Sequence, residues 1–365
     1  MPVLVVEEDR VLRQVGLLLD PATSAERTAA FLDYYAHDVE DFIAWREAVR
    51  AKLAGLYPSE VRIYSNQEEL REYLPAADVL IAERFAIGER ELERAPRLRV
   101  VQQFGSIVDN IDTRACRSRS LPLLTIRRRT NVACAEHTLM LILALAKKLP
   151  LTNGLVTDER LQARGFPPRP FDTRHVARAN FGRIPGIGTL LGRTLGLLGQ
   201  GEIGREVARF ARVLGMRVLY HKRRRLDAEK ERETGVEYCG FHELFERSDL
   251  VSLHVPLNSA TRGLVDAATL RRMKRGAFLI NISRASIVDR AALVDAVESG
   301  HLGGVGLDVL YREPTTPDDP LLHHENVIVT PHIAGASRMN SLMDIEEMLI
   351  GIARALSRRP SQPDE

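Results

Sequence analysis

The sequence predicts an α/β protein of two domains, one with a Rossmann-type, doubly wound parallel sheet and a smaller one that is flavodoxin-like. Three observations lead to this prediction. The chain of 365 residues is long for one hydrophobic core. Short apolar runs alternate with amphipathic stretches along most of its length. One apolar run, at residues 195–198, leads directly into the glycine-rich segment GQGEIG.

The glycine-rich segment has the spacing of a dinucleotide fingerprint. Gly199 suits the tight turn, Gly201 lets the backbone approach a pyrophosphate, and Gly204 lets the next helix pack on the sheet. A helix predicted at 203–214 directs its positive N-terminus at the phosphates. The flanking strands favour a nucleotide site over an ordinary strand and helix pair. The cofactor residues predicted in this segment are Gly199, Gly201, Glu202, Ile203 and Gly204.

A basic run follows the second strand of this unit, at the position where an NAD site offers an acidic side chain to the ribose. The run reads HKRRR at 221–225. Ammonium and guanidinium groups complement a phosphate dianion, so Lys222 and Arg223 predict a preference for NADP(H) over NAD(H). The alternative is a solvated basic loop at a strand end.

Composition narrows the possible classes of function. A formal charge of +2 argues against a nucleic-acid surface, and the longest apolar stretch, 139–146, is far too short for a membrane span. Three widely spaced cysteines support neither disulfides nor a metal site. We therefore expect a cytoplasmic protein that binds no metal, nucleic acid or membrane.

The apolar runs also outline the two domains. Residues 1–135 form the predicted substrate-binding domain, completed by a C-terminal segment at 336–365, and residues 136–335 form the predicted cofactor domain. Within the first domain, 25–53 is predicted as one long amphipathic helix. A segment at 150–193 is long for a plain connection, and either covers the cleft or contributes to a dimer interface. Further strands are predicted at 3–6, 61–64, 79–82, 98–102, 123–126, 217–220, 249–254, 278–281, 305–309 and 327–330, and further helices at 133–149 and 340–356.

Three polar residues follow successive strands of the cofactor domain: Arg284, Glu313 and His332. Taken singly, Arg284 would be a surface ion pair, Glu313 part of a turn, and His332 the cap of a strand. Together, after a cofactor fingerprint, they suit reduction of a 2-keto acid. Arg284 would hold the carboxylate and polarise the carbonyl, and His332 would protonate the developing alkoxide. Glu313 would keep His332 protonated and fix its tautomer, and oxidation would then need a higher pH.

With these motifs, the chain resembles the D-isomer-specific 2-hydroxyacid dehydrogenase family over roughly residues 79–335. The resemblance implies that Arg284, Glu313 and His332 are catalytic. It also implies that Asp308 contacts the nicotinamide carboxamide, and that family members are typically homodimers joined through the cofactor domain. Backbone amides near Gly105, Ser106 and Ile107 would bind substrate, and Pro256, Asn281 and Ile282 would lie along the cofactor.

The chain departs from the family pattern at three places. Ala285 and Ile107 stand where glycines are common, which would narrow or reshape the pocket. The usual Pro and Gly loop is replaced by three arginines at 127–129. We hypothesise that Arg128 or Arg129 binds an additional anionic group of the substrate. The alternative is that these arginines only support the linker between the two domains. The sequence favours neither interpretation over the other.

The function predicted from the sequence is therefore an NADPH-preferring 2-keto acid reductase, formally a D-2-hydroxyacid dehydrogenase. The particular 2-keto or 2-hydroxy acid is left open. One alternative is an oxidoreductase that acts on another small anion such as phosphite. Another is a non-catalytic, dinucleotide-sensing protein similar to the corepressors built on this fold. Glu313 argues against a formate dehydrogenase, in which the resemblance would call for glutamine.

Overall fold

The computed structural model describes residues 1–35 and 38–357, which form two compact units. The first unit contains residues 1–131 and the C-terminal segment from Ala336, and the second contains Val132–Gly335. The boundary expected from the sequence lies four residues later, after residue 135. Both units are parallel α/β sheets, which confirms the predicted fold class. No helix in the described part of the chain is long and apolar enough to span a membrane.

The sheet of the first unit has the strand order β2-β1-β3-β4-β5, all parallel. This is the flavodoxin-like order 2-1-3-4-5. Alternate residues of β1 face opposite cores: Leu4 and Val6 pack with α15, whereas Val5 packs with the helices of the other face. The strands are β1 Val3–Glu7, β2 Glu60–Tyr64, β3 Val79–Ala82, β4 Val100–Gln103 and β5 Leu123–Leu124.

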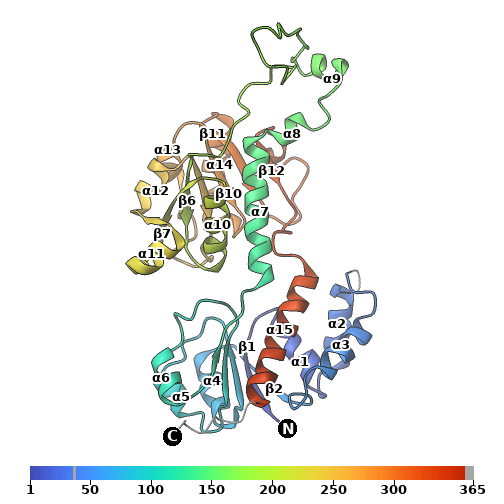
Figure 1. The fold of residues 1–365 in the computed structure, drawn as a ribbon, viewed down its shortest axis with the longest axis vertical. Coiled ribbons are helices and arrows are strands. Elements are labelled where there is room, and N and C mark those ends of the chain that lie inside the picture. Colours follow the sequence, from blue (N-terminus) through green and yellow to red (C-terminus); the bar gives the residue numbers. More distant parts are fainter. Residues whose placement is uncertain (36–37, 358–365) are drawn as a thin grey trace. The chain divides into compact units, whose positions relative to one another are not determined.

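The helices of this unit cover both faces of its sheet (Figure 1). The last helix of the chain, α15, contributes Ile345, Leu349 and Ile352 to the core around β1, β3 and β4. The helices are α1 Gln14–Leu19, α2 Ala25–Tyr35, α3 Phe42–Ala51, α4 Gln67–Tyr73, η1 Leu74–Ala76, α5 Glu89–Glu93, α6 Thr113–Ser118 and α15 Arg338–Ser357.

The single helix predicted at 25–53 is wrong, because the structure has two helices there, α2 and α3. A new helix begins after residue 41 because Asp41 caps its N-terminus. The side chain of Asp41 accepts a hydrogen bond from the backbone N–H of Ala44 at 2.8 Å and so caps α3. The apolar side chains expected along one side of this segment still pack together. Tyr35 and Phe42 are buried in one small core, with Phe31 and Trp45 packed against it. Residues 36 and 37 lie outside the described residues.

The sheet of the second unit has seven parallel strands in the order β12-β11-β10-β9-β6-β7-β8. Its direction of progression reverses beside β6, which is the switch point where doubly wound sheets bind ligands. The strands are β6 Thr194–Leu198, β7 Arg217–His221, β8 Glu237–Tyr238, β9 Leu250–Leu253, β10 Ala277–Asn281, β11 Leu302–Leu307 and β12 Val327–Val329. The short strand β8 was not predicted.

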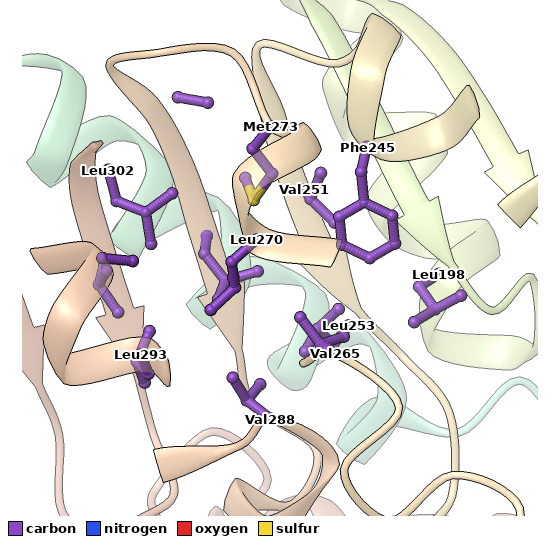
Figure 2. Close-up of a cluster of buried hydrophobic side chains, with 14 of the residues drawn as sticks. Leu198, Phe245, Val251, Leu253, Val265, Leu270, Met273, Val288, Leu293 and Leu302 are labelled. Carbon is purple, nitrogen blue, oxygen red and sulfur yellow. The ribbon is translucent and has the colours of Figure 1, made fainter. Parts of the chain in front are cut away.

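Two cores hold this sheet between helices. On one face, Phe245, Leu270 and Leu293 of the helices pack against Val251 and Leu279 of the strands, and Figure 2 shows part of this cluster. On the other face, α7 and α10 pack against β6 and β7. The helices are α7 Arg129–Ala146, α8 Leu149–Thr152, α9 Asp158–Ala163, α10 Glu202–Val213, α11 Ala228–Thr234, α12 Phe241–Arg247, α13 Ala267–Arg272, η2 Ala285–Ile287, α14 Arg290–Glu298 and η3 Pro320–His323.

The segment at 150–193 has a small core of its own. Leu155, Leu161 and Ile184 are buried together, with Leu151 and Phe166 packed against them. Other apolar side chains of the segment, including Val156 and Val176, are exposed. The segment is therefore ordered by local packing, while part of its apolar surface still faces solvent.

Candidate active site

A pocket of about 810 Å³ lies at the carboxyl ends of β6, β7 and β9 in the second unit. These ends meet at one edge because the strands are parallel and adjacent. The pocket is mostly apolar, with a basic group of side chains on one side. Its lining includes Leu198, Gly199, Gln200, Gly201, His221, Lys222, Arg223, Arg224, Phe241, His254, Val255, Pro256, Asn258, Ala260, Thr261 and Leu264.

The three fingerprint glycines have different surroundings. Gly199 has φ +103°, and a Cβ there would lie 2.3 Å from the carbonyl oxygen of His254. A Cβ on Gly204 would lie 2.5 Å from the carbonyl oxygen of Gly199, so α10 could not approach its strand as closely. A Cβ on Gly201 meets nothing within 4 Å. Gly201 thus leaves open space at the N-terminus of α10, where backbone N–H groups suit a pyrophosphate.

Two buried polar groups in the pocket lining also fit a polar ligand. Gln200 is 1 % exposed, and both heavy atoms of its side-chain amide lack a hydrogen-bond partner among the described residues. The Nε2 of His254 contacts the hydroxyl of Ser252 at 2.8 Å, whereas its Nδ1 has no partner there. Burial lowers the pKa of His254 to about 4, so the ring is neutral at physiological pH. Together with the glycine cradle, these residues fit a nicotinamide dinucleotide.

The basic run divides into two parts with different surroundings. His221, Lys222, Arg223 and Arg224 line the pocket. Arg225 instead donates two hydrogen bonds to Glu231 of α11, at 2.9 and 2.8 Å, and its guanidinium lies over a tyrosine ring. The predicted phosphate-binding residues Lys222 and Arg223 are therefore part of the pocket, and the last arginine of the run is a structural ion pair.

Arg284, Glu313 and His332 follow β10, β11 and β12, which are neighbours in the sheet. Parallel strands bring their following residues to one edge. The Nδ1 of His332 lies 2.8 Å from Oε2 of Glu313. Glu313 Oε1 accepts the backbone N–H of Leu310 at 2.9 Å, which orients the carboxylate toward the imidazole. The contact with Glu313 thus engages Nδ1 of the imidazole and not Nε2.

The charge of Glu313 depends on its neighbours. Its partial burial opposes ionisation, but the hydrogen bonds from His332 and from the Leu310 amide outweigh this effect and hold the pKa of Glu313 below its usual 4.5. The positive charge of Arg284 acts in the same direction. Arg284 is exposed, and its Nη1 donates to the carbonyl oxygen of Ser283 at 2.6 Å. The structure therefore brings the three residues into one electrostatic group.

Asp308 lies beneath this group. It is fully buried and accepts hydrogen bonds from the Thr330 hydroxyl at 2.6 Å and from the backbone N–H groups of Ile333 and Ala334 at 2.9 and 2.8 Å. These donors flank His332, so Asp308 holds the loop that carries the imidazole. The contact with the nicotinamide carboxamide implied for Asp308 stays a prediction. Ile282, also predicted beside the cofactor, is 8 % exposed.

Comparison with known proteins decides the family. A model of the D-isomer specific 2-hydroxyacid dehydrogenase, NAD binding domain, matches residues 139–334. The chain belongs to this family. It is an NAD(P)-dependent oxidoreductase that acts on the CH–OH group of 2-hydroxy acids.

Its relatives include a glyoxylate reductase of Korarchaeum cryptofilum, 39 % identical over 252 residues, which cover 69 % of this chain and 71 % of the relative. A D-3-phosphoglycerate dehydrogenase of Archaeoglobus fulgidus is 31 % identical, over 82 % of this chain and 54 % of the relative. Among solved structures, a glyoxylate reductase from Paecilomyes thermophila has a TM-score of 0.54 at 26 % identity, over 86 % of this chain and 92 % of that one.

The dehydrogenase's predicted substrate residues lie in its first unit. Gly105, Ser106 and Ile107 follow β4, and the carbonyl oxygen of Gly105 accepts the backbone N–H of Ile126 at 3.0 Å. Arg128 donates to Glu83 at 2.8 Å and lies over the ring of Phe104, 4.1 Å from its centroid. Burial raises the pKa of Glu83 although Arg128 opposes this. The part of these residues in substrate binding stays a prediction.

Arg129 has a different environment. It pairs with Asp344 at 3.1 Å and with Glu347 at 2.7 Å, both on α15. Asp344 is almost completely buried and also accepts the backbone N–H of Arg129 at 2.9 Å. These contacts tie the start of α7 to α15 within the first unit. They favour the structural alternative for Arg129 over a role in binding substrate.

Several pocket residues of the dehydrogenase were missed in the sequence. Gln200 lies inside the fingerprint itself, between two predicted glycines, and His254 lies two residues before the predicted Pro256. Their position at strand ends beside the fingerprint was a usable signal. Phe241 lies twenty residues beyond β7, at the start of α12, and carried no such signal.

Proposed function

We propose that the enzyme is an NADPH-preferring reductase of small 2-keto acids, with glyoxylate and hydroxypyruvate as the first substrates to test. The observation that carries the NADPH preference is the basic run after β7, of which Lys222, Arg223 and Arg224 line the cofactor pocket. An acidic residue at this strand end favours NAD, whereas basic residues complement a 2′-phosphate. The names of several relatives, which are glyoxylate reductases, support the substrate class.

In this proposal, Gly199, Gly201 and the N-terminus of α10 hold the pyrophosphate, and Lys222 and Arg223 hold the 2′-phosphate. When bound, the nicotinamide supplies a hydride for the carbonyl carbon of the keto acid. Arg284 binds the substrate carboxylate and polarises the carbonyl. Its guanidinium is suited to this because it is exposed and has several N–H donors.

His332 is the proposed proton donor. Its Nδ1 faces Glu313 at 2.8 Å, so Nε2 delivers the proton to the carbonyl oxygen as it becomes an alkoxide. An ionised carboxylate beside the imidazole stabilises the positive charge that the ring carries as a proton donor. In the reverse direction, the neutral imidazole accepts the proton of the substrate hydroxyl. Oxidation is therefore favoured at higher pH.

We further propose that the enzyme is a cytoplasmic homodimer that forms through its second unit. One pocket is lined by Leu139, Met140, Leu143 and Ala144 of α7, together with Leu149 of α8 and Phe210 of α10. Met140 is 44 % exposed and Leu149 53 %, which is much apolar surface for two helices of the cofactor unit. None of the three cysteines forms a disulfide in the described part of the chain, in keeping with a reducing compartment. Light scattering of wild type and Met140→Glu tests the dimer.

The experiment that tests the reductase is a parallel measurement of initial rates with NADPH and with NADH. The substrates are glyoxylate, hydroxypyruvate, pyruvate, phenylpyruvate and 2-oxoglutarate near neutral pH. A higher kcat/KM with NADPH for any of them supports the proposal, and the best substrate begins to define the pocket. An NADH preference means that the basic run is only solvated. Cofactor binding without turnover would favour a dinucleotide sensor.

A further inference from the structure

The backbone of His332 has a conformation that needs support. Its φ is +55°, a left-handed value that few residues other than glycine adopt. Such a conformation persists only where the surroundings enforce it. The backbone N–H groups of Ile333 and Ala334, which follow His332, both donate to Asp308. The buried carboxylate therefore holds the chain on the C-terminal side of the imidazole.

The same carboxylate holds the chain on the N-terminal side. The hydroxyl of Thr330, two residues before His332, lies 2.6 Å from Oδ1 of Asp308. The other acceptor near this hydroxyl, the carbonyl oxygen of Leu307, is farther away at 3.3 Å, so Thr330 uses its single hydroxyl proton in the bond to Asp308. The remaining lone pairs of the Thr330 oxygen are then free to accept a hydrogen bond.

His137 of α7 supplies that hydrogen bond. Its Nε2 lies 2.9 Å from the Thr330 hydroxyl oxygen and 3.4 Å from Oδ1 of Asp308, and its side chain is 11 % exposed. Because both of these oxygens act as acceptors toward it, Nε2 must carry a proton. The tautomer of His137 is thereby assigned by its partners. The imidazole links α7 to the loop that carries His332.

We propose that His137 is a positioning residue for the proton donor His332, through Thr330 and Asp308. This inference rests on the proposed function in that His332 is taken as the proton donor. The contact between His332 and Glu313 is half exposed, at 47 % and 40 %, and it orients the ring without fixing the backbone that carries it. The buried network behind it fixes the backbone from which the ring projects.

The test compares wild type with His137→Leu, which removes the donor, and His137→Gln, which keeps an N–H near the position of Nε2. His301→Leu is the matched control, because the Nε2 of His301 contacts the carbonyl oxygen of Leu270 at 3.0 Å in the same unit and away from the loop. For each variant, kcat and KM with glyoxylate and NADPH, the Kd for NADPH and the Tm are measured.

We expect His137→Leu to lower kcat by roughly 10-fold or more, because general acid catalysis depends on placement of the acid. The Kd for NADPH should change less than about threefold, and His137→Gln should recover most of kcat. An unchanged kcat in His137→Leu overturns the inference, as does an equal loss in His301→Leu. Should His137→Leu fail to fold, equal kcat values for His137→Gln and His137→Asn overturn it, because the shorter amide cannot reach Thr330.

Hydrogen exchange of the peptide that contains residues 330–335 separates this inference from the proposed function. If wild type turns over no keto acid, the proposed function fails, but the network is still tested. The amides of Ile333 and Ala334 should exchange faster in His137→Leu than in wild type, and equally fast in wild type and His301→Leu. Equal exchange in His137→Leu and wild type overturns the inference whatever the activity.

Discussion

The Nδ1 of His332 lies 2.8 Å from Oε2 of Glu313, and the second carboxylate oxygen of Glu313 is held by the backbone N–H of Leu310. One nitrogen of the imidazole is therefore committed to a carboxylate that has little freedom to rotate. The arrangement orients the second nitrogen and supports the proposed tasks of the two residues, which are proton transfer for His332 and charge compensation for Glu313.

The first prediction concerns the pH dependence of this pair. The pKa of Glu313 is lower in the folded protein than its usual 4.5. A carboxylate with a depressed pKa contributes stability that is present above its usual pKa and is lost as the pH falls through the lowered value. We therefore expect the melting temperature to show no loss from this pair down to about pH 5, and reduction to remain active there. Melting curves and reductive kcat across the acid range check this.

The substitution Glu313→Gln gives the matching test of mechanism. Because the neutral amide carries no charge to stabilise a cationic imidazole, reductive kcat should fall by about 100-fold. Reductive kcat of wild type and variant near neutral pH measures the difference. An unchanged kcat would mean that the charge of Glu313 takes no part in the proton transfer.

The second prediction concerns cofactor choice. Arg223 is exposed at the pocket, whereas Arg225 is paired with Glu231. Arg223→Ser should therefore lower the ratio of kcat/KM with NADPH to kcat/KM with NADH by about 10-fold to 100-fold. This range corresponds to the free energy of one charged hydrogen bond to a phosphate. Arg225→Ser is the control and should leave the ratio unchanged. Equal effects of the two variants would point to the net charge of the region as the cause.

How far the sequence predicted this enzyme depends on the range of the interactions. Strand ends and glycine spacing are local, so Gly199, Lys222 and the three residues after β10, β11 and β12 could be located in advance. The partners of Arg129 and His137 could not, because Asp344 and Thr330 lie 215 and 193 residues further along the chain. The break between α2 and α3 was missed because the apolar pattern continues across it while the cap at Asp41 interrupts the backbone.

The third prediction separates two glycines of the fingerprint. A Cβ on Gly201 meets nothing within 4 Å, so Gly201→Ala should fold with an unchanged Tm. Its methyl group would occupy the space that a pyrophosphate needs, and the Kd for NADPH should rise by about 10-fold or more. A Cβ on Gly204 would lie 2.5 Å from a carbonyl oxygen, so Gly204→Ala should lower the Tm itself. Thermal melts with and without NADPH distinguish the two variants. An unaltered Kd for NADPH in Gly201→Ala would mean that the pyrophosphate binds elsewhere.

The fourth prediction concerns the arginines that replace the usual loop before α7. Arg129 pairs with two carboxylates of α15, one of which, Asp344, is almost completely buried. Arg129→Met should lower the Tm, because a buried carboxylate loses a charged partner, and should leave the KM for keto acids unchanged. A changed KM would instead favour the binding hypothesis for Arg129.

Arg128 requires a double substitution, because removing it alone would leave the part-buried Glu83 with only the more distant Arg84, at 3.5 Å, as a partner. In Arg128→Met with Glu83→Gln, the methionine keeps an apolar stem over Phe104 and both charges are gone. If Arg128 binds a further anionic group, the KM for 2-oxoglutarate should rise by about 10-fold while that for glyoxylate changes less than about threefold, since glyoxylate has a single carboxylate. Steady-state kinetics on both substrates, with Glu83→Gln as the control, check this. Equal KM values in the double variant and the control would mean that Arg128 only supports its own loop. A guanidinium that contacts the substrate could not be removed without changing the KM of at least one of these two differently charged keto acids.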